Sequence, residues 1–357
     1  METKMRQTIT EGSAKIKVEK TEKISSEMEV FYNPSMKLNR DIAVLFLNAI
    51  PEKNLRIALP LEASGIRGIR FIKELPEEKI ESIEMNDRSK DAFESMKQTL
   101  KLNKITSDKI MLHNKDANIF LLSSRKFHYI DIDPFGTPNP FLDSAVKALR
   151  NYGYLAVTAT DTAALAGTSR NACIRKYWAV PRRDSNMHET AVRILIRKIQ
   201  LIGAQYHIAL MPLLSYHHLH SYRIYLKANI SKEKTGEILS LHGIDKDSGP
   251  MWLGKLSDKD LLEKIISSEN TDEKLKKFIE IILAETKIGT IGFYDIHEFC
   301  EKNKINPIPK FENIMNKIKS LGHEASRTHF CLTGIKSDIS EEELLGILKT
   351  TITKILN

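Results

Sequence analysis

The sequence predicts an α/β fold with a doubly wound, mostly parallel sheet, followed by a smaller, mainly helical domain with a winged-helix-like end. Apolar segments of strand length alternate with segments of helical periodicity through the first part of the chain. Around residues 229–245 the composition changes to Lys, Glu, Ser and Gly, and helical segments follow. The 357 residues suffice for two domains, which we place at residues 1–230 and 231–357.

The strand-like segments of the first domain resemble one another at their ends. They lie, in order, at residues 55–60, 80–87, 110–116, 127–133 and 153–161. Helices are expected around them at residues 42–50, 69–75, 89–103, 140–149 and 189–200, and later strands at 206–211 and 221–228. Four of the segments end in an aspartate: Asp87, Asp116, Asp133 and Asp161. In a parallel sheet these ends share one edge, where open α/β folds bind ligands, so we expect the functional site there.

The run Asp133-Pro134-Phe135-Gly136 is suited to chemistry on a nucleic-acid base. Proline cannot donate to a sheet and glycine permits a turn, so the strand is expected to stop at its aspartate. A carboxylate that accepts an N–H bond from an exocyclic amine, helped by the Pro134 carbonyl, directs the amine lone pair toward a methyl donor. The Phe135 ring can stack on a flipped base, and Phe31 could supply a second aromatic plane.

The turn after the first strand is suited to a nucleotide. The segment Glu62–Arg70 brings small residues to the start of a helix, although its G-x-x-G spacing is weak evidence by itself. It lacks the G-x-G-x-x-G pattern, which disfavours a nicotinamide cofactor. Asp87 lies 22 residues after Gly65, a spacing at which an acid binds ribose hydroxyls, and Asp116 could accept from an adenine amino group. We therefore expect an adenosine-type cofactor across the strand ends.

Basic residues are concentrated in the first part of the chain. The formal net charge is +8; residues 229–357 hold 19 Lys and Arg against 21 Asp and Glu, which leaves 35 against 25 for residues 1–228. This surplus favours a nucleic-acid partner, and a generally lysine-rich soluble protein is the alternative. Candidate phosphate contacts lie in a basic segment with aromatic neighbours: Arg170, Arg175, Lys176, Arg182 and Arg183. A solvated helix face explains that segment about equally well.

The second domain has the outline of a winged helix. Helices are expected near residues 258–267, 271–286, 293–303 and 311–321, and a strand near 324–330. A helix, a turn, a helix and a strand in that order commonly bind nucleic acid, with Arg327, His329 and Lys336 as the contact candidates. A helical dimerisation or cap domain is the alternative.

Other classes of protein are disfavoured by what the sequence lacks. No run of about 18 apolar residues marks a membrane span, and the charged N-terminal residues lack the apolar core of a signal peptide, so the cytoplasm is expected. The three cysteines form no C-x-x-C pair, and the histidines at 217, 218 and 220 have no carboxylate or cysteine nearby in sequence, so we expect no metal. No obligate protein partner is inferred.

Taken together, several segments resemble the tRNA (guanine(26)-N2)-dimethyltransferases. They are Val30–Pro34, Leu38–Asp41, Ser64–Arg70, Asn86–Asp87, Asp116–Asn118, Asp131–Gly136, Thr158–Asp161, Arg327–Phe330 and Thr333–Lys336. They cover nearly the whole chain in the right order. The resemblance implies a Rossmann-like class I methyltransferase domain that uses S-adenosylmethionine to methylate guanine at position 26 of tRNA, once or twice.

The resemblance also implies roles for particular residues. The cofactor contacts would be Arg40, Arg67 or Arg70, Asp87, Asp116 and Ala117. Asp133 would be the catalytic carboxylate, and Phe31 and Phe135 would hold the guanine between them.

The chain departs from the family pattern in two places. The family usually has an acid at the end of its first strand, where this chain has Leu59-Pro60; Glu62 could replace it. The cysteine zinc site of some members is absent. A DNA adenine-N6 methyltransferase is the first alternative, although those enzymes usually show two prolines before the aromatic residue. A non-catalytic RNA-binding protein and a nicotinamide oxidoreductase are the others.

Overall fold

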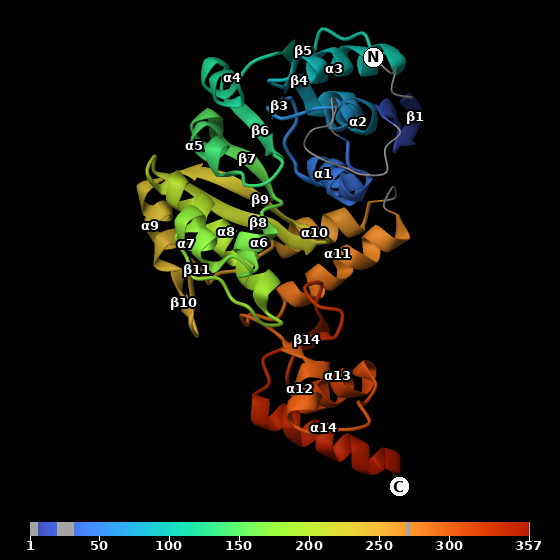
Figure 1. Cartoon of the computed structure of the whole chain (residues 1–357), viewed down its shortest axis with the longest axis vertical. Helices are drawn as coiled ribbons and strands as arrows, with labels where there is room; N and C mark the ends of the chain where they lie inside the picture. The colour runs from blue at the N-terminus through green and yellow to red at the C-terminus, as the bar shows by residue number, and fades with distance from the viewer. Residues whose placement is uncertain (1–5, 20–31, 269–271, 357) are drawn as a thin grey trace. The chain divides into compact units, whose positions relative to one another are not determined.

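The computed structural model describes residues 6–19, 32–268 and 272–356 (Figure 1). The chain folds as two compact units that interleave along the sequence. The first comprises residues 1–162, 198–213 and 219–241, and the second comprises residues 163–197, 214–218 and 242–357. The boundary expected at residue 230 thus falls inside the last segment of the first unit, and residues 163–197 pack with the C-terminal residues. Within the described ranges, no helix is long and apolar enough to cross a membrane.

A seven-stranded sheet with the strand order β5-β4-β3-β6-β7-β9-β8 is the largest sheet of the described residues. Its strands are β3 (Leu55–Leu59), β4 (Ile80–Asn86), β5 (Ile110–His113), β6 (Phe127–Ile132), β7 (Leu149–Ala159), β8 (Ile208–His218) and β9 (Ser221–Ile230). The five strands from β3 to β7 pair in parallel, and β9 runs antiparallel to β7. The direction of winding reverses between β3 and β6, which creates a switch point at their carboxyl ends. The predicted doubly wound, mostly parallel sheet is confirmed.

Helices cover both faces of this sheet in the first unit. α1 (Lys37–Ala49), α2 (Ile66–Glu74) and α3 (Lys90–Leu102) lie on one face, and α4 (Ala117–Ser123) and α5 (Asn139–Ala148) lie on the other (Figure 1). The remaining helices here are α9 (Lys232–Ser240) and the end of α8 (Met187–Ala204). The sequence did not predict α4, because Ile119 and Leu122 are exposed on it and obscure its helical periodicity.

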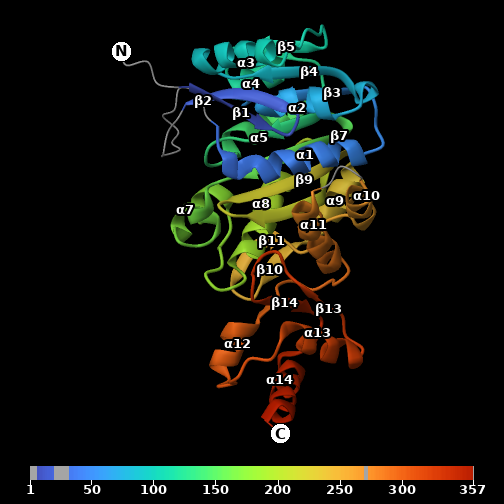
Figure 2. The same ribbon diagram turned by 90° about the vertical axis from the view of Figure 1, so that its right-hand side faces the viewer.

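An N-terminal hairpin packs against the helices of the first unit. Its strands, β1 (Arg6–Glu11) and β2 (Ala14–Glu19), are antiparallel (Figure 2). Alternate residues of β2, among them Ala14 and Ile16, are buried in a cluster with Ile66 and Ile69 of α2. This period-two burial is what places the hairpin over α2.

The second unit contains helices, a hairpin and a small C-terminal sheet. The first elements are α6 (Thr162–Leu165, beginning in the first unit), α7 (Arg170–Tyr177), β10 (His242–Asp245), β11 (Ser248–Trp252), α10 (Lys259–Ile266) and α11 (Glu273–Thr286). They are followed by β12 (Tyr294–Asp295), α12 (Ile296–Lys302), α13 (Phe311–Ser320), β13 (Ala325–Arg327), β14 (Gly334–Ser337) and α14 (Glu341–Leu356).

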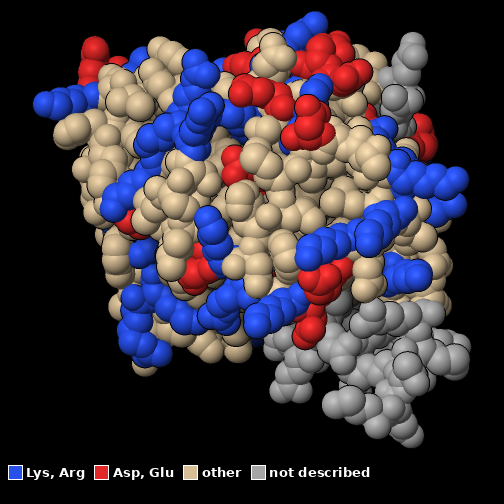
Figure 3. Space-filling view, turned by 90° about the horizontal axis from the view of Figure 1, so that it is seen from above, with Lys and Arg blue, Asp and Glu red and all other residues tan. Residues whose placement is uncertain are grey.

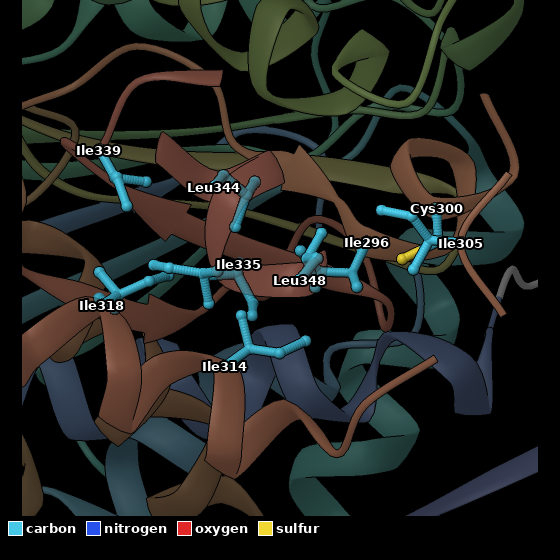
Figure 4. Close-up of a cluster of buried hydrophobic side chains, with 11 residues drawn as sticks. Ile296, Cys300, Ile305, Ile314, Ile318, Ile335, Ile339, Leu344 and Leu348 are labelled. Carbon is cyan, nitrogen blue, oxygen red and sulfur yellow. The ribbon is translucent and has the colours of Figure 1, made fainter. Parts of the chain in front are cut away.

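The C-terminal elements form the helix-turn-helix-strand arrangement expected from the sequence. The strands make an antiparallel sheet in the order β12-β14-β13, with α12 and α13 between the first and second strands in the chain. Ile296, Ile314, Ile335 and Leu348 come from both helices, the sheet and α14 and are buried together (Figure 4). α14 closes this core and was not predicted.

Candidate active site

The turn after β6 presents a carboxylate and an aromatic ring at the same sheet edge. Asp133 follows the last strand residue, Pro134 is buried, and Phe135 is 67% exposed. Gly136 adopts a φ of +91°, a conformation that L side chains rarely adopt. Its amide donates to Thr160 Oγ1 (2.7 Å), and the Thr160 amide donates to the Gly136 carbonyl (2.9 Å). This reciprocal bonding fixes the turn to the end of β7, as the sequence predicted for a strand that stops at its aspartate.

Arg67, in the first turn of α2, lies between two carboxylates of the β6 region. Its Nη1 donates to Asp131 Oδ2 (3.2 Å), and its Nη2 donates to Asp133 Oδ2. Burial would lower the pKa of the Arg67 guanidinium, but Asp131 and Asp133 outweigh that effect and raise it. The arginine is therefore charged, and it engages one oxygen of the candidate catalytic group.

Asp131 lies at the centre of the buried charges beneath this turn. Arg223 of β9 donates to both of its oxygens (2.8 and 2.6 Å), and the Tyr129 hydroxyl donates to Oδ2 (2.7 Å). Arg223 also donates to Thr158 Oγ1 on β7 (2.8 Å). Burial alone would raise the pKa of Asp131, but Arg223 and Arg67 hold it below its usual value. The two arginines thus favour the charged form of Asp131, and its contacts join three strands and a helix.

The loops after β3, β4 and β5 are tied together next to this turn. The Asn86 side chain donates to the Pro60 carbonyl (3.0 Å) and accepts from the Lys115 amide (3.0 Å). Asp87 accepts from the backbone amides of Ala63 (3.0 Å) and Ser89 (2.9 Å). The role of Asn86 was missed, because an amide within a strand gives no signal of which loops it will join.

Asp116 and Ala117 begin α4 at the same edge. Asp116 caps the helix by accepting from the amides of Asn118 (2.9 Å) and Ile119 (3.4 Å), and Ala117 is buried. Asp87 and Asp116 keep unused acceptor capacity, since a carboxylate can accept about four hydrogen bonds. Carboxylates at the tip of β4 and after β5 fit the ribose hydroxyls and adenine amine of an adenosine-type cofactor. The donor and acceptor set therefore fits the group expected from the sequence.

Glu62 supplies a buried carboxylate just after β3, a strand that does not end in an acid. Leu59 ends β3 with an apolar, buried side chain, and Glu62 Oε1 accepts from the Gly68 amide of α2 (2.8 Å). Burial raises the pKa of Glu62 to about 8, and Asp131 and Asp133 add to the rise while Gly68 and Arg67 oppose it. A cationic group bound beside Glu62 would favour its charged form.

The other two arginines expected at the cofactor are buried in ion pairs. Arg40 donates to both oxygens of Glu11 (2.6 Å each). Arg70 pairs with Glu11 (3.1 Å), Asp41 (2.6 Å) and Glu74 (2.8 Å). Their contact with a cofactor stays a prediction, and so does the role of Phe31, which lies outside the described residues.

The residues expected to bind RNA separate into exposed and buried ones. Arg170, Arg175 and Lys176 are exposed on α7, and Arg183 is exposed after it. Arg182 is buried and pairs with Asp245 (2.9 Å). Figure 3 shows that Lys and Arg side chains spread over much of one face of the molecule, whereas Asp and Glu gather in smaller groups. Exposure keeps the first four residues as candidates for phosphate contact.

The expected contacts of the winged-helix-like end are engaged within the protein. Lys336 is buried and pairs with Glu189 (2.9 Å), and His329, with a side chain 1% exposed, pairs with Glu285 (2.9 Å). The Arg327 guanidinium lies 4.0 Å from the centre of the Phe311 ring. Burial therefore argues against direct RNA contact by Lys336, His329 and Arg182, which the sequence analysis had proposed. No group of three or more His, Cys, Asp or Glu that could hold a metal occurs within the described ranges.

Comparison with known proteins agrees with the resemblance noted in the sequence. The chain matches the family model described as "N2,N2-dimethylguanosine tRNA methyltransferase" over residues 12–245 and 241–349. It is 35% identical over 376 residues to the tRNA (guanine(26)-N(2)/guanine(27)-N(2))-dimethyltransferase of Aquifex aeolicus, covering 94% of each chain. It is 37% identical over 382 residues to the tRNA (guanine(26)-N(2))-dimethyltransferase of Pyrococcus furiosus, covering 96% of this chain and 98% of the relative.

A solved structure resembles the fold over nearly the whole chain. The complex of Trm1 from Pyrococcus horikoshii with S-adenosyl-L-methionine superposes with a TM-score of 0.87 at 33% sequence identity. The match covers 96% of this chain and 99% of that one. The recognised family and the expected Rossmann-like fold are confirmed.

Proposed function

This chain belongs to the family of N2,N2-dimethylguanosine tRNA methyltransferases, and from that premise we infer that it methylates the exocyclic N2 amine of guanine 26 in tRNA. The methyl groups come from S-adenosylmethionine, one or two for each guanine. The single observation that carries the residue roles is the turn after β6, where a carboxylate and an exposed aromatic ring share one sheet edge.

Asp133 is the residue we assign to the substrate amine. Arg67 engages its Oδ2, and we assign Oδ1 to an N–H bond from guanine N2. Accepting that bond localises the nitrogen lone pair, which is otherwise delocalised into the purine ring. The Pro134 carbonyl is assigned to the second amine hydrogen. When the bound cofactor gives its methyl group to N2, the methyl–sulfur bond would break with its electron pair staying on the sulfur, and N2 would pass its surplus proton to the Asp133 carboxylate and then to water.

Phe135 is the residue we assign to holding the base. The residue is 67% exposed, so its ring can be reached by a guanine that has left its stack. Stacking on an aromatic ring contributes roughly 1–3 kcal/mol per base in proteins that bind single strands. Phe31 is the proposed opposite wall, and the exposed basic residues of α7 are the proposed contacts to tRNA phosphates.

The cofactor is assigned to the loops after β3, β4 and β5. S-adenosylmethionine supplies a methyl group on a sulfonium when it is bound. Asp87 and Asp116 would accept hydrogen bonds from its ribose and adenine, and Glu62 would face its cationic amino group. Arg40, Ala117 and either Arg67 or Arg70 remain further proposed contacts.

The test is methyl transfer to tRNA followed by nucleoside analysis. The protein is incubated with labelled S-adenosylmethionine and unmodified tRNA, with the same tRNA carrying adenine at position 26 as the control. Labelled N2-methyl- and N2,N2-dimethylguanosine from the first tRNA alone would support the assignment. Labelled N6-methyladenosine would instead support an adenine methyltransferase, and tRNA binding without incorporation would support a non-catalytic RNA-binding protein.

A further inference from the structure

Asp131 has no part in the reaction described above, yet its own carboxylate is bonded to three other side chains. It lies on β6, two residues before Asp133, and Arg67 contacts both carboxylates. Its side chain is 1% exposed and accepts from Arg67, Arg223 and Tyr129. A buried charge in this position needs an explanation, because an apolar residue avoids the cost of removing a carboxylate from water.

The four charges of this cluster alternate in sign along a chain of contacts. Arg223 binds Asp131, Asp131 binds Arg67, and Arg67 binds Asp133. The side chains of the first three residues are at most 6% exposed, whereas that of Asp133 is 20% exposed. The buried network therefore ends at the surface on the carboxylate that we assign to the substrate.

The geometry of the Arg67 guanidinium links its contact with Asp131 to its contact with Asp133. A guanidinium is planar and its donors point in fixed directions, so holding one nitrogen determines where the other points. Asp131 holds Nη1 of Arg67, and Nη2 is the nitrogen that binds Asp133. Arg223 grips both oxygens of Asp131 and is itself bonded to Thr158, which prevents the Asp131 carboxylate from turning.

We propose that Asp131 and Arg223 are positioning residues, which fix Arg67 so that it aims the Asp133 carboxylate at the substrate amine. The proposal rests on the role proposed for Asp133. Without Asp131, Arg67 would keep only Asp133 of the two carboxylates that it now binds, and it would draw that carboxylate inward. The carboxylate would then be a poorer and misdirected acceptor for the N–H bond, although the cofactor and tRNA would bind as before.

The test compares Asp131→Asn, which keeps the shape and removes the charge, with Arg223→Lys, which keeps the charge and removes the two-armed grip. For each variant, single-turnover methyl transfer, the Kd of S-adenosylmethionine, the Kd of tRNA and the thermal midpoint are measured. We expect the transfer rate to fall about tenfold or more, since displacement of a reacting group by about 1 Å can cost roughly a hundredfold. Both Kd values are expected to stay within about threefold.

Lys227→Gln is the matched control. Lys227 lies on the same strand and face as Arg223 and pairs with Glu52 (3.0 Å), but it touches none of the four residues of the network. We expect its transfer rate to match that of the unchanged protein. The inference is overturned if both test variants transfer at the unchanged rate, if their loss appears as weaker cofactor binding, or if Lys227→Gln loses as much.

Asp133→Ala distinguishes failure of this inference from failure of the proposed function. If Asp133→Ala transfers normally, the role assigned to Asp133 is wrong. If Asp133→Ala is inactive while both test variants are normal, only the positioning role is wrong.

Discussion

The buried charges beneath the tip of β6 and those on α8 are arranged in opposite ways. At β6 the contacts run from Arg223 through Asp131 and Arg67 to a partly exposed carboxylate. On α8, Glu189 accepts from Arg193, from Lys336 and from the Gly292 amide, and all of these charged side chains are buried. The first network leaves acceptor capacity at the surface, and the second uses its capacity inside the protein.

The two central carboxylates nevertheless have similar electrostatics. Burial would raise the pKa of Glu189, but Lys336 and Arg193 bring it down to about 2. Asp131 is likewise held below its usual value by two arginines. A depressed pKa therefore does not tell a functional network from a structural one, and what differs is whether the chain of contacts ends on a group that a substrate can reach.

Among the substitutions that test this difference between the two networks, we expect the largest effect from one at Asp133. Asp133→Ala should lower the rate of methyl transfer roughly 10²–10⁴-fold, the range typical for loss of an acid–base group. It should leave tRNA binding within a few-fold, because the exposed basic residues are unchanged. Single-turnover kinetics measure the rate of methyl transfer, and a filter-binding titration measures tRNA binding. A normal transfer rate in the variant would contradict the role assigned to Asp133.

A substitution in the Glu189 network on α8, whose charged side chains are all buried, should lower the stability of the protein and leave RNA binding unchanged. Lys336→Met removes one partner of Glu189 and should lower the free energy of unfolding by about 3 kcal/mol, as expected for breaking a buried pair. Denaturant unfolding measures the change. A loss of tRNA affinity in a variant of normal stability would instead restore Lys336 as an RNA contact.

Glu62 is a buried carboxylate whose pKa is raised, in contrast to Asp131 and Glu189, whose pKa values are lowered. Between its unfolded value of 4.5 and the folded value of about 8, the folded state holds the extra proton, so stability falls as the pH rises through this window. Glu62→Gln should remove that pH dependence and stabilise the protein by about 1–2 kcal/mol at pH 8, less than the full shift implies because Gln buries an amide instead.

The measurement for Glu62 is denaturant unfolding at pH 5 and pH 8, paired with cofactor titration. We expect the variant to bind S-adenosylmethionine more weakly, because a neutral amide does not compensate a cationic amino group. Equal unfolding free energies for both proteins at pH 8 would show that Glu62 carries no such cost.

The smallest effect is expected on the basic surface of α7. Arg175→Ala should weaken tRNA binding a few-fold and reduce the slope of log affinity against log salt by about 1 for each phosphate that the protein no longer binds. Its transfer rate at saturating tRNA should be unchanged. Arg182→Ala is a useful companion, since Arg182 is buried and pairs with Asp245, which predicts lower stability rather than a changed salt slope.

The sheet and the residues at its edge were predictable because their signals are local. Apolar segments that end in Asp87, Asp116 and Asp133 define strand tips, and parallel strands bring such tips to one edge. The acids were therefore located correctly before any contact was known.

The partners of the basic residues were not predictable, because they lie far away in the sequence. Lys336 pairs with a residue 147 positions earlier, and Arg223 with one 92 positions earlier. A lysine at an RNA surface and a lysine in a buried pair look the same in sequence. The partners of Asp131 were therefore not foreseen, and RNA contacts were expected at Lys336, His329 and Arg182, which the structure places in contacts with acids of the protein itself.

The N-terminal hairpin carries a consequence for how this protein can be shortened. Glu11, on its first strand, is the acid that Arg40 and Arg70 share, and the Ser13 amide in its turn donates to Glu74. A chain begun after the hairpin would keep the sheet and every residue assigned to catalysis. It would nevertheless bury two guanidinium groups without their common acid, and expose the apolar side of α2 to water. The hairpin thus acts as an internal counter-ion and cover for the methyltransferase fold, and a minimal catalytic fragment has to include it.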